Sequence, residues 1–282
     1  MDNQIPTIPN DVQDRSSTAW LKLCAYVDQV AAEERDEFSP FEALGPELFA
    51  QIFTLPESIS KLKKVTKIWL YGSKLQRIPP EIGEMESLEY FDPYTSYNLH
   101  WFPYELIYCT KLKDSRISTR ALYGNCKNRM DFPLLHNNPV RYAGDKLHCS
   151  ICKKEMSHAE TNQLWITLRV ATDVIPLLAN LCSRACENKL ATPPEKYIQI
   201  PHKGASSLEQ ADENSWAYVT NPFQSYIMEA HARTVKAEET KPEETKPQET
   251  KPKEIKPEEI KPEENLWKGL PALKRIIKIW DK

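Results

Sequence analysis

Glycine is scarce in this chain, at 7 of 282 residues, and no glycine-rich loop of the kind that binds phosphate is present. The zinc-protease motif HExxH and the esterase motif GxSxG are also missing. The net charge of -3 shows no excess of basic residues, which a nucleic-acid-binding protein usually has. These absences disfavour the common catalytic and nucleic-acid-binding classes, and we expect a protein that is not an enzyme.

Two further absences bear on where the protein works. The first residues are polar and acidic, without the basic stretch and apolar run of a secretory signal. No segment approaches the ~18 consecutive apolar residues that a membrane-spanning helix needs. The cysteine count of 7 is odd, which in the absence of a signal favours a reducing compartment over a disulfide framework. We therefore expect a cytoplasmic protein.

Hydrophobic residues make up 40% of the chain, enough for a real core. Apolar residues recur at steps of three and four from Trp20 to Ala31, which predicts an amphipathic helix. The pair Ser39-Pro40 is typical of a helix start, with proline at the first helical position. A second helix is expected near residues 41–53, broken around its Gly-Pro pair.

A repeat begins in the middle of the chain. Apolar–proline pairs recur 23 and 24 residues apart, at Leu55-Pro56, Ile78-Pro79 and Phe102-Pro103. With the apolar spacing between them, residues 52–135 resemble the leucine-rich-repeat family, whose stacked units share one core. We expect an α+β fold: a short leucine-rich-repeat solenoid capped by N-terminal helices, followed by a small zinc-binding module and a disordered tail, the last two for reasons given below. The alternative is an ordinary α+β core whose spacing imitates a repeat.

Four of the cysteines form two close pairs, Cys149 with Cys152 and Cys182 with Cys186. The first pair is expected in a tight turn and the second on the first turn of a helix, so that all four sulfurs can face one ion. Between the pairs, WITLRVAT is typical of a strand. Four thiolates suit tetrahedral Zn²⁺ and leave no open position for a catalytic water, so we predict one structural zinc ion. The alternative is four reduced cysteines packed as small apolar side chains.

Three segments carry a closer resemblance: LHWFPYELIYC (99–109), STRALYGN (118–125) and WITLRVATDVIPLLANLCSRAC (165–186). Together with the first cysteine pair, they resemble an uncharacterised family of bacterial proteins with a leucine-rich-repeat domain and a C-terminal four-cysteine, treble-clef-like zinc module. The resemblance covers roughly residues 55–204. It implies a repeat protein with an integral metal module, and no established activity.

The end of the chain differs in composition from the rest. Five prolines at five-residue intervals block regular helix and indicate a stiff spacer. The last 18 residues follow as a predicted basic amphipathic helix, suited to an anionic membrane surface or to a groove on a partner protein. Folding back onto the body is the alternative. The residues predicted for docking are Trp267, Leu270, Leu273, Ile277 and Trp280.

We expect a scaffold or adaptor protein that binds a protein partner of unknown identity through the outward faces of its repeat strands. Aromatic side chains mixed with arginine favour protein binding. The alternative classes are an enzyme or a nucleic-acid-binding zinc protein. The predicted partner-binding residues are Lys67, Trp69, Tyr71, Tyr90, Asp92, Tyr94, Asp114, Arg116 and Ser118.

These features divide the chain into seven expected parts: a disordered leader (1–15), an N-terminal helical cap (16–54), leucine-rich repeats (55–140), a four-cysteine zinc module (141–204), a C-terminal extension (205–235), a Lys-Pro-Glu repeat linker (236–264) and a basic amphipathic helix (265–282).

Overall fold

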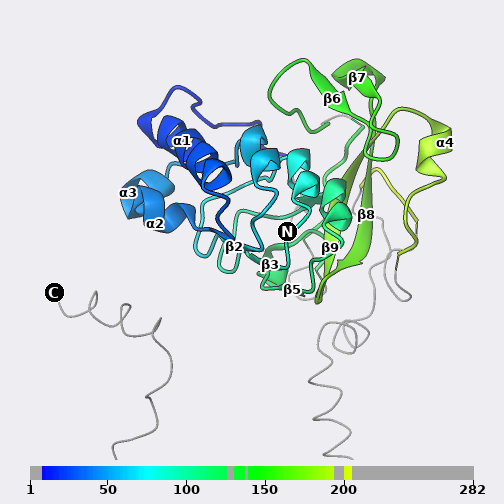
Figure 1. Ribbon diagram of the computed structural model, residues 1–282. Helices are drawn as coiled ribbons and strands as arrows, with labels where there is room; N and C mark the ends of the chain where they lie inside the picture. The colour runs from blue at the N-terminus through cyan, green and yellow to red at the C-terminus, as the bar shows by residue number, and fades with distance from the viewer. Residues whose placement is uncertain (1–7, 126–129, 137–138, 194–199, 205–282) are drawn as a thin grey trace, which may run out of the picture. The chain divides into compact units, whose positions relative to one another are not determined.

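A computed structural model of the chain describes residues 8–125, 130–136, 139–193 and 200–204 (Figure 1). The first helix, α1 (Thr18–Ala32), confirms the amphipathic pattern, and the side chain of Ser17 caps it by accepting a hydrogen bond from the backbone of Trp20. The second predicted helix is broken as expected, into α2 (Pro40–Leu44) and α3 (Pro46–Phe49). Gly45 separates them with a φ of 76°, a conformation that favours glycine.

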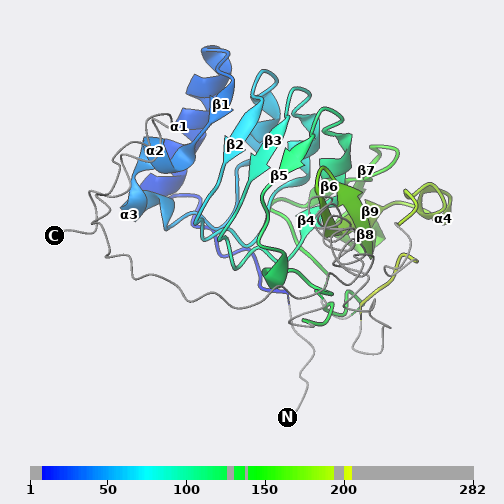
Figure 2. The ribbon, with the colours of Figure 1, turned by 90° about the horizontal axis from the view of Figure 1, so that it is seen from below.

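A parallel sheet follows the helices, in the order β1-β2-β3-β5. Figure 2 shows these strands side by side. Their bounds are β1 (Glu37–Phe38), β2 (Lys67–Trp69), β3 (Tyr90–Asp92) and β5 (Asp114–Ser115). In register, Lys67 lies beside Tyr90, which lies beside Asp114. Equivalent side chains of neighbouring strands therefore stand in rows across the sheet.

Short 3₁₀ turns connect the parallel strands. They are η1 (Glu57–Lys61), η2 (Pro80–Glu84) and η3 (Tyr104–Tyr108), and a proline of the periodic apolar–proline pairs precedes each one. The strands bury one face, where Ile68 and Phe91 are fully inaccessible to solvent. The core therefore lies between the sheet and these turns, and the other face of the sheet is left toward solvent.

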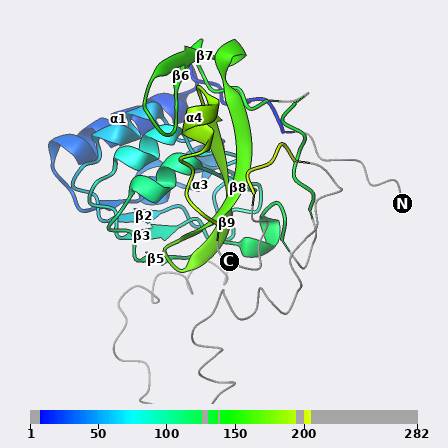
Figure 3. The ribbon, with the colours of Figure 1, turned by 90° about the vertical axis from the view of Figure 1, so that its right-hand side faces the viewer.

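A second strand system is built differently. β8 (Asn162–Val170) and β9 (Asp173–Leu181) form a long antiparallel hairpin, and β4 (Phe102–Pro103) pairs in parallel with the other edge of β9. Nearly every residue of β8 and β9 is buried. Figure 3 shows the hairpin with a smaller one, β6 (Lys146–His148) and β7 (Glu155–Ser157), at its upper end. The remaining elements are η4 (Thr119–Ala121), η5 (His158–Glu160) and α4 (Arg184–Glu187).

The predicted α+β class with a leucine-rich-repeat solenoid is wrong, because the described residues form a mixed α/β structure of parallel and antiparallel sheets. The third apolar–proline pair, Phe102-Pro103, does not continue the parallel sheet but forms β4 and pairs with Leu177 and Leu178 of β9. The physical reason is that β9 is buried on both faces, and its backbone groups at both edges need hydrogen-bonding partners. β8 supplies one edge and β4 the other.

Several predicted segments lie outside the described residues: the first seven residues of the leader (1–7), the extension (205–235), the linker (236–264) and the basic helix (265–282). Within the described residues, no helix has the length and apolar character needed to cross a membrane.

Candidate metal centre

The first cysteine pair sits in the turn of the β6–β7 hairpin. The amide of Cys149 donates to the carbonyl of Lys154 at 2.9 Å, and the amide of Lys153 donates back to the carbonyl of Cys149 at 2.9 Å. Lys153 adopts a φ of 62°, which lets the chain reverse within so few residues. The expected tight turn is present, with Cys149 buried on its inner side and Cys152 exposed at its tip.

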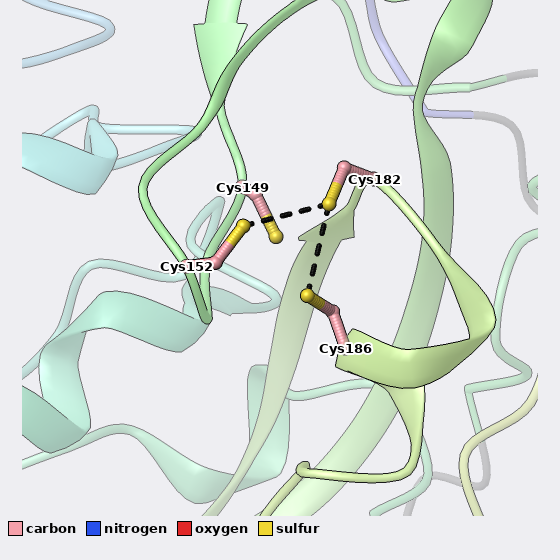
Figure 4. Close-up of side chains that lie close together, drawn as sticks. All are labelled: Cys149, Cys152, Cys182 and Cys186. Carbon is pink, nitrogen blue, oxygen red and sulfur yellow. Dashed lines mark hydrogen bonds between the residues drawn. The ribbon is translucent and has the colours of Figure 1, made fainter.

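The second pair brackets the start of α4. Cys182 directly follows β9, and Ser183 is the N-cap residue, whose side chain accepts a hydrogen bond from the amide of Cys186 at 3.3 Å. The prediction that both cysteines belong to the first helical turn is therefore corrected for Cys182, which precedes the helix. The cap still bends the chain so that both sulfurs face the same side (Figure 4).

Ser150, which is fully buried, ties the hairpin turn to β9. Its amide donates to the carbonyl of Asn180 at 2.6 Å, and its hydroxyl accepts from the amide of Asn180 at 2.9 Å. The hydroxyl of Tyr108, from η3, donates to the carbonyl of Ser150 at 2.5 Å. These bonds hold the first cysteine pair against β9, which ends at Leu181, directly before Cys182.

The four sulfur atoms converge, as Figure 4 shows. Sγ of Cys182 lies 3.5 Å from Sγ of Cys152 and 3.7 Å from Sγ of Cys186. All four sulfurs lie within 4.8 Å of one another. These separations are far longer than a disulfide bond of about 2.05 Å. A tetrahedral ion with metal–sulfur bonds of about 2.3 Å would set the sulfurs about 3.8 Å apart. The cluster therefore fits a metal ion, and the four cysteines could hold one.

The electrostatics of the cluster also fit a cation. Burial raises the pKa of Cys149, but hydrogen bonds from the backbone of Cys152, Ile151 and Cys182 outweigh burial and lower it to about 7. The Ser183 hydroxyl lowers the pKa of Cys182, yet the three neighbouring cysteines and desolvation together raise it to about 12. The turn therefore favours the thiolate form of Cys149. The neighbouring cysteines disfavour a second thiolate at Cys182 until a cation neutralises the charge.

No other group of three or more histidine, cysteine or acidic side chains in the described ranges is close enough to hold a metal. The donor set is also closed, since four cysteines satisfy a tetrahedral ion without water. The centre is therefore suited to a structural ion and not to a hydrolytic one.

The residues predicted to bind a partner lie on or beside β2, β3 and β5. Tyr71 and Tyr94 are 57% and 41% exposed, but Asp92 and Ser118 are buried. Asp92 accepts hydrogen bonds from the Tyr90 hydroxyl at 3.2 Å and from Arg116 at 3.3 Å. Asp92 and Ser118 therefore support this surface instead of contacting solvent from it.

Two residues beside this surface of the parallel sheet were not among those predicted from the sequence. Glu37 comes from β1 and accepts from Lys67 at 2.8 Å and from the Trp69 indole at 3.2 Å. Tyr97, which follows β3, is 64% exposed. No apolar–proline pair marks β1, so no periodic signal could have placed Glu37. The predicted docking residues of 265–282 fall outside the described residues.

Comparison with known proteins gives no match, whether the chain is scanned against protein-family models or searched against curated proteins or solved structures. The fold and the site thus define a mixed α/β chain with a four-cysteine centre, and the resemblance to bacterial repeat proteins stays a prediction.

Proposed function

We propose that this chain is a non-enzymatic binding protein that recognises a protein partner through one face of its parallel sheet. We call this the aromatic face and define it by Trp69, Tyr71, Tyr90, Tyr94 and Arg116. The observation that carries the proposal is that these rings lie toward solvent yet pack on one another. Trp69 and Tyr90 have centroids 5.0 Å apart, and Tyr71 and Tyr94 6.1 Å apart.

The packing of the aromatic face matters for affinity. The Arg116 guanidinium lies 5.1 Å from the centroid of Tyr94 and also bonds to buried Asp92. Side chains held in place before binding lose less conformational entropy when a partner arrives. Tryptophan, tyrosine and arginine are also the residues that dominate binding energy at protein interfaces. The face is therefore pre-ordered and of suitable chemistry for a protein surface.

We further propose that the four cysteines hold one structural Zn²⁺. Soft thiolate donors in a tetrahedral set favour zinc over hard cations such as Mg²⁺ and Ca²⁺. The ion would join the β6–β7 turn, which carries Cys149 and Cys152, to the end of β9 and to α4. Its role would be to hold that part of the fold together, because no coordination position is left for substrate.

Affinity purification tests the binding proposal. Full-length protein is compared with a variant carrying Trp69→Ala, Tyr90→Ala and Arg116→Ala, with bound proteins identified by mass spectrometry. The control is Leu21→Ala, which removes a 59% exposed apolar side chain from α1. We expect the triple variant to lose partners that the wild type and the control both retain. If the folded triple variant retains every specific partner, the aromatic face is not the binding surface.

A further inference from the structure

The four sulfurs of the candidate metal centre differ in their access to solvent. Cys149 and Cys186 are buried and belong to the hydrophobic core. Cys152 is exposed, and Cys182 is half-buried against that core. Oxidation of cysteine depends on how accessible the sulfur is. A small oxidant that arrives from solvent therefore reaches Cys152 and Cys182 before the other two.

The two accessible sulfurs also lie close together, although they belong to different elements. Sγ of Cys152, at the tip of the β6–β7 turn, lies 3.5 Å from Sγ of Cys182, which directly follows β9 (Figure 4). A disulfide bond is about 2.05 Å long, so the two atoms need to approach by about 1.5 Å to form one. Hydrogen bonds between Ser150 and Asn180 already hold the two segments together. Rotation of the two side chains is therefore sufficient for the approach.

Cys186 attaches the short helix α4 to the same centre. α4 has four residues, too few for a helix that is stable alone. The Asn162 amide donates to the carboxylate of Glu187 at 3.5 Å, which is long for a hydrogen bond. The amide of Ala191 donates to the Tyr104 hydroxyl at 3.0 Å. Loss of a metal bond at Cys186 should therefore loosen α4 more than it loosens the β6–β7 turn.

We propose that Cys152 and Cys182 are a peroxide-sensitive modification site, at which formation of a disulfide releases the metal ion and loosens α4. The release of the ion rests on the proposed zinc centre, whereas the pairing of the two sulfurs depends on their positions alone. The disulfide joins the β6–β7 turn to the end of β9, as the ion would. Cys186 then has no attachment to the centre, so oxidation changes the protein around α4 and leaves the core in place.

Hydrogen peroxide as the oxidant balances the reaction. The Cys152 thiolate attacks one oxygen of the peroxide and the O–O bond breaks, which with one proton from solvent gives a sulfenic acid and water. The Cys182 thiolate attacks the sulfenic sulfur and the S–O bond breaks, which with a second proton gives the disulfide and a second water. The two thiolates lose two electrons, and the peroxide gains them. Cys149 and Cys186 are too few to keep the ion and take up protons when it leaves.

Peroxide titration of the zinc-loaded full-length chain tests the site. A chromogenic chelator, at a concentration that leaves zinc on the reduced chain, follows the release of zinc, and mass spectrometry of an unreduced digest maps the disulfides. We expect loss of two thiols and of the zinc ion, with the Cys152–Cys182 disulfide in about tenfold excess over any other. Reduction with added zinc should restore the bound ion. The control Cys24→Ser, which removes a half-buried cysteine of α1, should behave like the wild type.

Hydrogen exchange distinguishes this oxidation from simple loss of metal. Peroxide should speed exchange in α4 by about tenfold while β6, β7 and the end of β9 keep their protection. Chelation under reducing conditions should instead expose all four segments, because no disulfide then replaces the ion. Equal loss of protection in α4 and in the β6–β7 hairpin after peroxide would contradict the proposed loosening of α4.

The disulfide map and the zinc measurement separate failure of this proposal from failure of the zinc centre. A zinc-bearing chain whose main product is a Cys149–Cys152 or Cys182–Cys186 disulfide would overturn the proposal. So would zinc release without a disulfide, or retention of zinc and all four thiols in millimolar peroxide. A folded chain that carries no zinc before peroxide is added would contradict the zinc centre, and with it the release step. Its disulfide map would still support or overturn the pairing of Cys152 with Cys182.

Discussion

The parallel sheet and the β8–β9 hairpin differ in the burial of their two faces. In β2, Ile68 is fully buried while its neighbours Lys67 and Trp69 point to the solvent side. In β9, the adjacent residues Leu177 and Leu178 are both fully buried. A strand with one free face has side chains available for recognition, whereas a strand covered on both faces contributes to the core alone. The difference separates a strand with one solvent-facing side from a strand that is wholly in the core.

The β8–β9 hairpin also contains buried polar side chains, which need hydrogen-bonding partners within the protein. The Gln163 amide donates to the side chain of Asn180 at 2.8 Å and to the carbonyl of Val140 at 3.0 Å. Asn180 is in turn bonded to Ser150 of the cysteine turn. The hairpin therefore links the core to the candidate metal centre, and η3 adds a second link through the Tyr108 hydroxyl.

Metal removal should have the largest effect on stability, and it should affect the region around the cysteine cluster but not the parallel sheet. Chelation or Cys149→Ser should destabilise β6, β7, α4 and the end of β9 by several kcal/mol, because metal binding at a closed thiolate site is coupled to folding. Hydrogen exchange followed by mass spectrometry should show those segments losing protection while β2 and β3 retain theirs. Cys24→Ser, a cysteine of α1 outside the cluster, is the control. Uniform loss of protection across both regions would contradict the division.

The next largest effect on stability is expected from truncation of adjacent side chains in each strand. Leu177→Ala and Leu178→Ala should each lower the free energy of unfolding by about 2–5 kcal/mol, because both side chains are fully buried. In β2 the effect should alternate, with Ile68→Ala costing about 2–5 kcal/mol and Lys67→Ala less than about 1. Urea denaturation of the four variants measures this. A small loss for either leucine would mean that one face of β9 is free.

The pH dependence of stability should report on Glu105, which lies between the two regions. Its folded-state pKa of about 7 lies above its ordinary value of 4.5, so the folded protein holds this proton more tightly. Stability should therefore fall as pH rises from about 4.5 to about 7, by up to about 3 kcal/mol from this group. Glu105→Gln should lack that fall. Urea titrations of both proteins across this range measure the difference, which cancels the pH dependence of metal binding common to both.

The smallest effect is expected at the solvent side of the parallel sheet. Lys113 pairs with Glu89 at 2.5 Å, but its side chain is 72% exposed. Such exposed pairs contribute less than about 1 kcal/mol. Lys113→Ala should therefore leave the urea midpoint nearly unchanged. A loss comparable to that of Ile68→Ala would show that charge pairs, and not the buried face, hold the parallel sheet together.

Local signals predicted local features of this fold. The apolar spacing around Trp20 gave α1, the Gly45-Pro46 pair gave the break between α2 and α3, and the alternating stretch from Trp165 gave part of β8. The cysteine spacing also predicted four sulfurs close enough to hold an ion. Closely spaced cysteine pairs have few chemical roles, so the two short cysteine motifs were sufficient to predict the sulfur cluster without knowledge of the fold.

Features that depend on distant pairing were not predictable in this way. β4 pairs Phe102 with Leu177, and nothing local to either residue indicates the other. The same apolar–proline signal precedes three 3₁₀ turns, and only the third also forms a strand with β9. The burial of Glu105 was not predictable either, since it depends on the approach of η2 at Gly83 and on the turn at Ser150.

Native mass spectrometry of the purified, reduced full-length chain tests the proposed zinc centre most directly. We predict one zinc ion per folded chain, with loss of that ion in Cys182→Ser and its retention in Cys24→Ser. A folded wild-type chain that carries no metal and keeps four free thiols, even after incubation with zinc, would contradict the proposed zinc centre.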